Sequence, residues 1–366
     1  MSFDILTFLG GIFILAASCY ALFKFTDELE DVGNELGRLL RLPQDVVAST
    51  FAALATSGPE IVMAILAATP FIMNEAWSDL MLGEKASSGT LNMAFSAMDN
   101  LLGIGAVAII FLMRKKMVKP NDPIPVKPSV IVGLGSYLII SLLLGFFMLD
   151  HLITEFEAWT LMIVGIISIV TQFFLPNWLE RRRHFNGTVL FEEDKITPKE
   201  PPPSPLTYKW IKEFATHSIL YAFLIFALIV FVRESLGATF DMAQATIFSV
   251  GGIIIMFTSY VSSFPEFMMT FHLAKANKQN ALLGMLFGSN IIDLAFAGFR
   301  AMWLHEPIEV YTTGLFPGLL NYYIWTLPAI AGLAFIGLYT GKIKYKHAYP
   351  AVAFYVVYIV SGFILL

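Results

Sequence analysis

Two acidic motifs of similar composition lie inside apolar stretches of this chain. The first reads Thr56-Ser57-Gly58-Pro59-Glu60 and the second reads Ser262-Ser263-Phe264-Pro265-Glu266. In each motif a glutamate follows a proline and has two hydroxyl residues one turn before it. A charged side chain in the middle of a membrane costs about 2.5–3.5 kcal/mol on insertion scales, so such a residue indicates function. Two such motifs, 206 positions apart, predict a duplicated cation site near the bilayer midplane.

Helical spacing gathers the oxygen atoms of each motif on one helix face. Residues three, four and seven positions before each glutamate share its face. These residues are Ala53, Thr56 and Ser57 before Glu60, and Ser259, Ser262 and Ser263 before Glu266. Each proline lacks an N–H, so it leaves the carbonyl of Ala55 or Val261 without its helical partner. Such a set of oxygens suits a hard cation such as Ca²⁺, which takes roughly six to eight oxygen ligands.

The next apolar stretch of each half adds a second polar pair, one helical turn apart. The pairs are Ser96 with Asn100 and Ser289 with Asp293. The small residues Gly288 and Ser289 would let this helix approach its neighbour closely. The two glutamates together carry a charge that one Ca²⁺ or a few Na⁺ would offset. Because nearby carboxylates favour retaining a proton, protons would compete with ions there.

Single features of these motifs also have ordinary structural explanations. A serine in a membrane helix usually bonds a carbonyl of the preceding turn, and a lone proline usually marks a kink. The repetition of the whole set at matched spacing favours a functional explanation. Asp99 would either line the same cavity or pair at a helix contact, whereas His217, His272 and Arg300 are expected to be structural or interfacial.

The elements that must position these residues are membrane helices. The 366 residues are 57% hydrophobic and 14% charged, which is far from the composition of a soluble domain. We predict an all-α polytopic membrane protein with about ten transmembrane helices, broken where they carry Glu60 and Glu266. These spans lie near residues 5–25, 46–71, 90–113, 128–149, 156–178, 213–233, 243–274, 280–304, 313–340 and 346–366.

A polar, proline-rich segment divides the spans into two groups of five. We predict a first five-helix repeat over 1–178, a cytoplasmic linker over 179–212 and a second five-helix repeat over 213–366. Because each half has an odd number of spans, the halves would have opposite orientations in the membrane, as inverted repeats do. A smaller polar insert lies at 74–89.

The distribution of positive charge predicts the orientation. With ten spans and an external N-terminus, 20 Lys and Arg residues fall inside and 3 fall outside. We therefore expect an integral protein of the cytoplasmic (inner) membrane, with both termini outside and the central loop cytoplasmic. Cys19 is the only cysteine, which excludes an internal disulfide and a cysteine-based metal cluster.

At these residues the chain resembles the cation/Ca²⁺ antiporter superfamily, nearest its prokaryotic sodium/calcium exchanger branch. That family carries two repeats, each with a Gly-[Thr/Ser]-Ser-x-Pro-Glu helix followed by a helix with Gly-Ser-Asn-x-x-[Asn/Asp]. The resemblance implies that Glu60 and Glu266 coordinate Ca²⁺. It implies further ligands at Thr56, Ser57, Ser262 and Ser263, backbone oxygens near Ala53 and Ser259, sodium-associated serines at Ser96 and Ser289, and a central polar pair at Asn100 and Asp293.

The chain departs from the family pattern at a few positions. Phe95-Ser96-Ala97 replaces the usual Gly-Ser-Asn, and Ala55 and Val261 replace the usual glycine. The first repeat also has 36 residues from Glu60 to Ser96, against 23 from Glu266 to Ser289. Phe95 would change the packing of the second and third spans, and so would affect ion affinity or selectivity more than the fold.

The resemblance implies a secondary active antiporter in which Ca²⁺ and Na⁺ compete for one site and cross by alternating access. One alternative is a Ca²⁺/H⁺ exchanger on the same fold, although proton-coupled relatives tend to have an Asn-Ala-x-Glu type motif instead of these serines. Another is a cation channel or a non-transporting cation sensor. An enzyme is not expected, because the chain has neither a P-loop nor a His-Glu-x-x-His motif. Beyond the transported ions and the lipid bilayer, we expect no cofactor and no nucleic acid.

Overall fold

The computed structural model describes residues 5–40, 47–58, 60–61, 64–65, 93, 96–97, 99–100, 124–125, 127–150, 152–185, 207–244, 259–276, 278–309, 342–343, 352–353 and 356. Almost all of these residues are helical. The predictions about the insert at 74–89, about Phe95 and about most of the linker lie outside the described residues.

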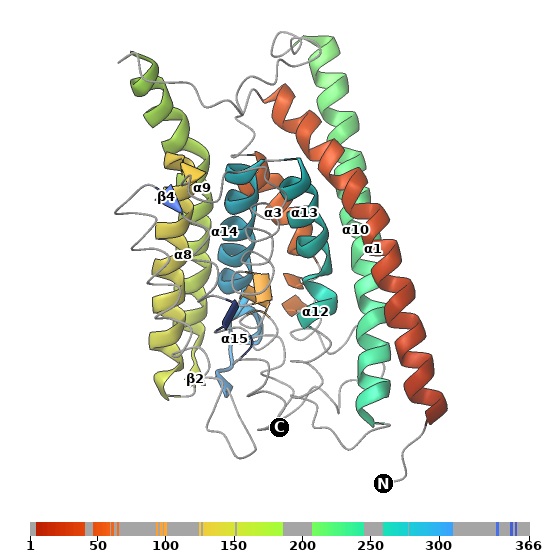
Figure 1. Ribbon diagram of the computed structural model, residues 1–366. Helices are drawn as coiled ribbons and strands as arrows, with labels where there is room; N and C mark the ends of the chain where they lie inside the picture. Colours follow the sequence, from red (N-terminus) through yellow and green to blue (C-terminus); the bar gives the residue numbers. More distant parts are fainter. Residues whose placement is uncertain are drawn as a thin grey trace.

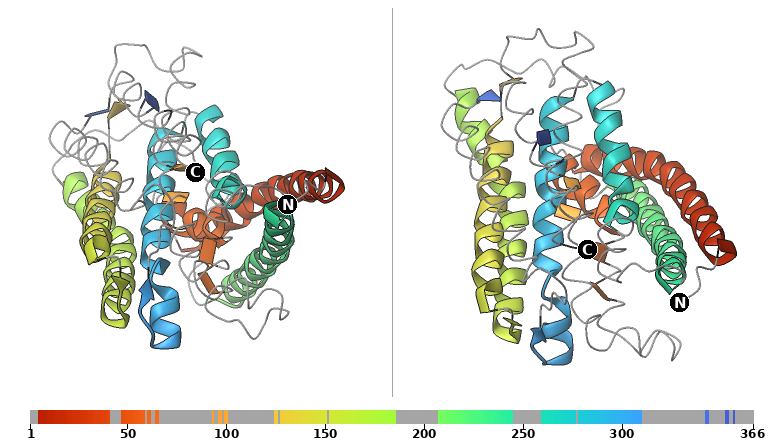
Figure 2. Two further views of the ribbon diagram at one scale, coloured as in Figure 1. Left: turned by 90° about the horizontal axis from the view of Figure 1, so that it is seen from below. Right: turned by 60° about the horizontal axis from the view of Figure 1, so that its bottom comes forward.

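Two long helices, α1 (Ile5–Leu39) and α10 (Tyr208–Gln244), run side by side along one flank of the molecule (Figures 1 and 2). At 35 and 37 residues they exceed the roughly 20 residues that cross a bilayer. Hydropathy predicted that the first span ends near residue 25, because the following turns are rich in charge. The helix continues because Leu29, Val32 and Leu36 recur at helical spacing and are buried.

The C-terminal end of α1 is fastened to the N-terminal end of α10. Trp210 donates from its indole Nε1 to the carbonyl of Leu39 at 3.0 Å. Arg38 contacts Glu213 at 3.5 Å and Glu35 at 2.7 Å, and the bond to Glu35 raises the pKa of Arg38 above its usual value. These contacts hold the two long helices together at one end.

A three-helix core lies on the opposite flank, made by α8 (Pro128–Phe147), α9 (Glu155–Phe185) and α14 (Gln279–Phe296). A short 3-10 turn, η4 (Met148–Asp150), follows α8, and α15 (Phe299–Leu304) follows α14. Among the described residues, three stretches are long and apolar enough to span a membrane: Ser129–Asp150, Glu155–Gln172 and Gln279–Leu304. They coincide with the spans predicted at 128–149, 156–178 and 280–304. Helix α9 continues seven residues past the predicted end at 178.

The core helices approach one another closely. A Cβ atom added at Gly165 of α9 would lie 2.3 Å from the Cβ of Ala295 on α14. The rings of Tyr137 on α8 and Phe287 on α14 stack with centroids 6.2 Å apart. Helix α14 is therefore closely packed against α8 and α9, and this packing restricts the movement of its side chains.

The helices that carry the acidic motifs lie between the core and the long pair (Figure 1). The first runs as a π-helical turn, η1 (Ala48–Ala52), into α3 (Ala53–Thr56), and the second as α12 (Ser259–Ser262) and α13 (Phe264–Lys275). Each is interrupted at its motif, at Ser57 (φ −77°, ψ 3°) and at Ser263 (φ −80°, ψ 4°). The predicted breaks are therefore present, and the two have nearly the same backbone conformation.

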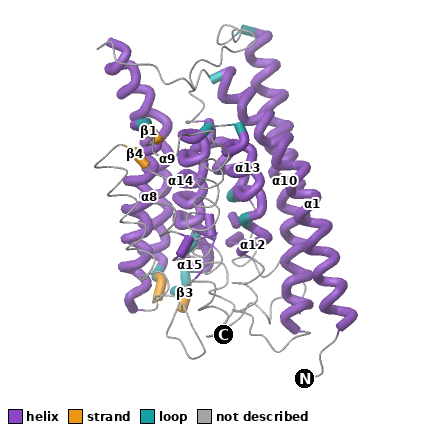
Figure 3. The backbone as a smooth tube through the Cα atoms, viewed as in Figure 1, coloured by secondary structure: helices purple, strands orange, loops and turns teal. Residues whose placement is uncertain are grey.

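Two pairs of two-residue strands join distant segments, and the all-α expectation did not include them. Strand β1 (Ile124–Pro125) pairs with β4 (Lys342–Ile343), and β2 (Leu152–Ile153) pairs with β3 (Ile308–Glu309), both antiparallel. Figure 3 shows β1 and β4 toward one end of the helices and β3 toward the other. Each pair connects the first half of the chain to the second.

Candidate ion-binding site

Each predicted site residue is buried, with at most 2% of its surface exposed. These residues are Ala53, Thr56, Ser57, Glu60, Ser96, Asn100, Ser259, Ser262, Ser263, Glu266, Ser289 and Asp293. They come from the two interrupted helices, from α14 and from the described residues of the third predicted span. Hydrogen bonds connect most of them, in a pattern that repeats between the two halves of the chain.

The serine at each helix break contacts a serine of the other half. The Oγ of Ser57 lies 2.7 Å from the Oγ of Ser289, and the Oγ of Ser263 lies 2.7 Å from the Oγ of Ser96. The sequence separations are 232 and 167 residues. The two halves therefore meet through these hydroxyl groups at the motifs themselves.

Each partner serine also holds the glutamate of its own half. Ser96 donates to Glu60 Oε1 at 3.0 Å, and Ser289 donates to Glu266 Oε1 at 2.9 Å. A hydroxyl has one proton to give, so Ser96 accepts from Ser263. By the same argument Ser289 accepts from Ser57. Two matched relays thus run from a motif serine, through a serine on another helix, to a glutamate.

The hydroxyls that precede each break bond backbone carbonyls one turn earlier. Thr56 donates to the carbonyl of Ala53 at 3.2 Å, and Ser262 donates to the carbonyl of Ser259 at 3.1 Å. The same carbonyls also accept the backbone N–H groups of the two break serines, each at 2.9 Å. The structural explanation of a hydroxyl bonded to its own helix therefore applies to Thr56 and Ser262.

Several buried polar atoms of the site have no hydrogen-bond partner among the described residues. They include Oε2 of Glu60, Oε2 of Glu266, and both amide atoms of Asn100. Neither carboxylate oxygen of Asp293 makes a hydrogen bond of good geometry there, although the hydroxyls of Ser57 and Ser96 lie near it. Buried polar groups without partners are rare and costly in native proteins. Unpaired carboxylate oxygens gathered in one place are suited to a bound cation.

The three carboxylates of the site lie within electrostatic range of one another. Glu266 is repelled by both Glu60 and Asp293, and Asp293 is repelled by Glu60. Within the described residues, no group of three His, Cys, Asp or Glu side chains has the arrangement of a self-sufficient metal centre. A cation bound here would therefore take part of its coordination from serine hydroxyls or backbone carbonyls.

Helix α14 reaches the first motif helix because of a glycine. A Cβ atom added at Gly288 would lie 2.2 Å from the carbonyl oxygen of Ser49 and 2.9 Å from the Cβ of Ala53. The predicted close approach at this position is present. It places Ser289 against Ser57 at the break.

Further buried polar residues lie near the predicted site, among them Asp99, which the sequence placed either in the cavity or at a helix contact. Asp99, which has 1% of its surface exposed, lies beside Asn100. Asn290, fully buried beside Ser289, has no partner for its amide among the described residues. Tyr221 on α10 donates from its hydroxyl to the carbonyl of Phe51 in η1. No sequence pattern pointed to Tyr221, because an aromatic residue in an apolar helix cannot be distinguished by sequence from the many aromatic residues that face lipid.

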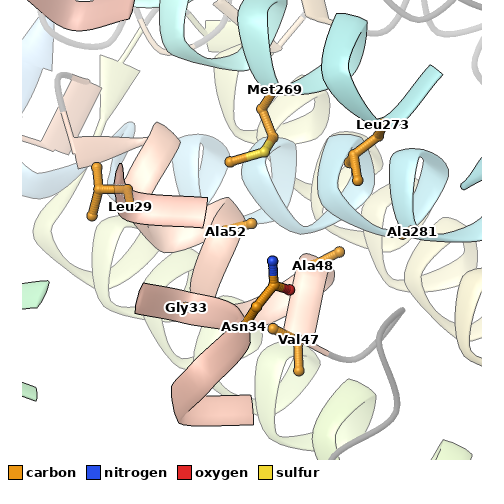
Figure 4. Close-up of a pocket in the computed structure, with 9 residues that line it drawn as sticks. All are labelled: Leu29, Gly33, Asn34, Val47, Ala48, Ala52, Met269, Leu273 and Ala281. Carbon is orange, nitrogen blue, oxygen red and sulfur yellow. The ribbon is translucent and has the colours of Figure 1, made fainter. Parts of the chain in front are cut away.

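A small cavity of about 10 Å³ lies beside the site helices (Figure 4). Its walls come from α1, η1, α13 and α14, and of these lining residues only Asn34 has a polar side chain. The lining residues are Leu29, Gly33, Asn34, Val47, Ala48, Ala52, Met269, Leu273 and Ala281. On the first motif helix the lining residues come before the break, and on the second they come after Glu266. The cavity is therefore displaced from the carboxylates. Its volume would hold about one water molecule.

Known proteins share both sequence and fold with this chain. Residues 4–174 match the family described as sodium/calcium exchanger protein. No curated protein sequence matches the chain.

The fold is similar to solved structures of the sodium-calcium exchanger NCX_Mj. The form soaked with 2.5 mM Na⁺ and 10 mM Sr²⁺ has a TM-score of 0.63 and 18% identity, over 96% of this chain and 99% of that one. The form soaked with zero Na⁺ and Ca²⁺ has a TM-score of 0.62 and 17% identity, over 98% and 99%. The form soaked with 2.5 mM Na⁺ and 0.1 mM Ca²⁺ has a TM-score of 0.61 and 18% sequence identity, and the match covers 99% of each chain.

The fold is similar to that of NCX_Mj over nearly the whole chain, and the three long apolar helices fit an integral membrane protein. The family match covers residues 4–174 of the 366 and is consistent with the cation/Ca²⁺ antiporter superfamily, which the two Pro-Glu motifs resemble.

Proposed function

We propose that this protein is a secondary active antiporter that exchanges Ca²⁺ for Na⁺ by alternating access. The observation that carries the proposal is the matched pair of buried glutamates, Glu60 and Glu266. Each is bonded through one oxygen to a serine, and each keeps its second oxygen without a partner among the described residues. The family match over residues 4–174 and the similarity to NCX_Mj, whose structures were soaked with Na⁺, Ca²⁺ or Sr²⁺, support the same ions for this chain.

The chemistry of the site supports competition between the two ions. A Ca²⁺ ion would bridge the free oxygens of Glu60 and Glu266, because two carboxylates offset its charge and a divalent ion prefers many oxygens. Sodium ions would bind the same glutamates together with the serines that already contact them. The same carboxylates cannot bind Ca²⁺ and Na⁺ at the same time. Binding of one ion therefore excludes the other, and this competition couples the transport of Ca²⁺ to the transport of Na⁺.

The strand pairs support the proposed topology of ten spans in two inverted repeats. Strands that pair must lie on one side of the membrane, so β1 and β4 share a side and β2 and β3 share a side. The ten-span prediction places six spans between β1 and β4 and four between β2 and β3. Both are even numbers, as each pairing requires. In this topology the first pair is cytoplasmic and the second is external, in an inner membrane with both termini outside.

Proton coupling is the second candidate, because the three site carboxylates repel one another and a proton on one would relieve that repulsion. The serines favour sodium, since each adds an oxygen that a proton does not need. A cation channel or a cation sensor could use the same buried ligands. A channel would carry ions without a counter-ion and a sensor would carry none, so transport assays distinguish both from an antiporter.

The test is uptake of radiolabelled Ca²⁺ into proteoliposomes loaded with Na⁺ or with choline, with and without a pH gradient. We expect uptake that requires internal Na⁺ and vanishes in Glu60→Gln. Glu28→Gln is the matched control, because Glu28 is an exposed carboxylate on α1. Uptake driven by the pH gradient alone would move the protein to proton coupling. Uptake without any counter-ion dependence would overturn the antiporter proposal.

A further inference from the structure

A tyrosine on the long helix pair reaches the backbone of the first motif helix. Tyr221 of α10 is 8% exposed, and its hydroxyl donates to the carbonyl of Phe51. The two aromatic rings also meet edge to face, with centroids 6.0 Å apart and an interplanar angle of 88°. Both contacts fall on one residue, so Tyr221 holds Phe51 through its ring and through its carbonyl.

The residue that Tyr221 holds lies in a π-helical turn. Phe51 belongs to η1, and the N–H of Ala53 bonds the carbonyl of Ala48, five residues earlier, as π-helical geometry requires. A π turn contains one residue more than an α turn. If η1 relaxed to an α-helix, everything after it would rotate by roughly 100° about the axis relative to the turns before it. The residues directly after η1 are those of α3 and the break at Ser57, followed by Glu60.

The form of this turn therefore decides which way the first motif faces. In the observed form, Ser57 meets Ser289 and Glu60 meets Ser96. A rotation of the size given above would remove both contacts. A carbonyl inside the turn that accepts a hydrogen bond from another helix is stabilised in its present position, because its hydrogen bond to the tyrosine would be lost on rotation.

We infer that Tyr221 is a positioning residue for the cation site: by bonding the Phe51 carbonyl it holds η1 in its π-helical form and so fixes the face that presents Ser57 and Glu60. The inference rests on the proposed function, since it assigns Tyr221 a part in cation affinity. Tyr221 contributes no ligand, and it acts from a helix that carries none of the predicted site residues.

Helix α10 offers its own matched control. Trp210 lies three turns before Tyr221 and also donates from its side chain to a backbone carbonyl, that of Leu39 at 3.0 Å. Its bond ends on α1, however, and not on a motif helix. Tyr221→Phe and Trp210→Phe thus each remove one side-chain-to-backbone bond of α10, and only the first touches η1.

The experiment measures equilibrium binding of ⁴⁵Ca²⁺ and the concentration dependence of its uptake in monodisperse purified protein and in proteoliposomes. Tyr221→Phe should weaken calcium affinity roughly 2- to 12-fold, the range of one hydrogen bond, and raise the KM for uptake in parallel. The maximal rate per folded transporter should be retained, and Trp210→Phe should leave affinity and KM unchanged. Equal effects of the two variants, or a loss of maximal rate with unchanged KM in Tyr221→Phe, would overturn the inference.

A double-mutant cycle gives a second, independent reading. If Tyr221 acts through the first motif helix, Tyr221→Phe combined with Ser57→Ala should cost less affinity than the sum of the two single changes. Combined with Ser141→Ala, which changes a buried serine of α8 whose hydroxyl has no partner among the described residues, it should be additive. Additivity with both serines would show that Tyr221 has a general structural role, which contradicts the inference.

The two proposals fail in different ways. If the unmodified protein shows no sodium-dependent calcium uptake, the proposed function fails. If it shows normal uptake and Tyr221→Phe has the same calcium affinity, only the role of Tyr221 fails. Binding of ⁴⁵Ca²⁺ is read separately from transport, so the position of η1 can be tested even if the counter-ion is a proton.

Discussion

The hydroxyl oxygens of Ser57 and Ser289 lie 2.7 Å apart, although 232 residues separate them in the chain. Ser96 and Ser263 are related in the same way, at the same distance. Each contact joins the break in one motif helix to a helix of the other half, and each continues to a glutamate. The two acidic motifs are therefore parts of one connected site and do not form two independent ones.

The first prediction concerns the serine bridge. Ser57→Ala should weaken calcium binding by roughly 2- to 12-fold, because it removes one hydrogen bond worth about 0.5–1.5 kcal/mol while Ser289 keeps its bond to Glu266. The pair Ser57→Ala with Ser289→Ala should cost less than the sum of the single changes. Equilibrium binding of ⁴⁵Ca²⁺ measures both effects. Ser141→Ala is the control, since Ser141 is fully buried but its hydroxyl has no partner among the described residues. If Ser141→Ala has the same effect, the bridge has no special role.

The second prediction concerns the glutamates. Glu60→Gln and Glu266→Gln should each abolish sodium-dependent calcium uptake while the protein remains folded. The amide keeps the size and one acceptor oxygen of the side chain, but it removes the charge that a divalent ion requires. Folded protein is checked by size-exclusion chromatography before uptake is measured in proteoliposomes. Normal coupled flux in either variant would show that the site has been assigned to the wrong residues.

The third prediction concerns the central polar pair. Asp293→Asn should reduce uptake less than Glu266→Gln does, because Asn100 already supplies an amide at the matching position of the other half. Removing one of three mutually repelling carboxylates also relieves part of that repulsion. The comparison is the initial rate of calcium uptake in the two variants at equal amounts of folded protein. Equal damage would mean that the charge of Asp293 is itself required.

The fourth prediction concerns the approach of α14 to the first motif helix. Gly288→Ala should lower stability by about 1–3 kcal/mol, because the new methyl group would overlap the Ser49 carbonyl and the Ala53 side chain. Thermal unfolding in detergent, followed by tryptophan fluorescence, measures the change. Gly135→Ala is the control, since a Cβ atom there meets nothing within 4 Å. An unchanged melting temperature for Gly288→Ala would mean that the two helices separate without cost.

Local sequence patterns were sufficient to locate the two interrupted helices and to predict that the polar residues near the breaks are buried. A glutamate and two hydroxyls in an apolar run, repeated at matched spacing, identified the two interrupted helices, and the breaks occur at Ser57 and Ser263 as expected. Burial of the twelve predicted residues follows from the same logic, because a polar side chain in a membrane helix turns away from lipid. Hydropathy also located three of the long apolar helices.

Features that depend on contacts between distant segments could not be predicted in this way. Hydropathy cannot follow α1 past residue 25, because that part of the helix is polar and is held by packing against α10. The π-helical form of η1 has no sequence signature, and the bond from Tyr221 to Phe51 depends on which helices are neighbours. The strands are two residues long, which is too short for any alternation of apolar and polar residues to show.

The serine bridges also constrain how the protein is made. Ser57 and Glu60 enter the membrane early in synthesis, yet the partner of Ser57 is 232 residues further along the chain. Until Ser289 has been synthesised, the first motif lacks the residue that Ser57 contacts across the two halves. Assembly of the site must therefore follow insertion of nearly all the helices. A chain that ends before Ser289 would therefore lack the partner of Ser57 and could not complete this arrangement.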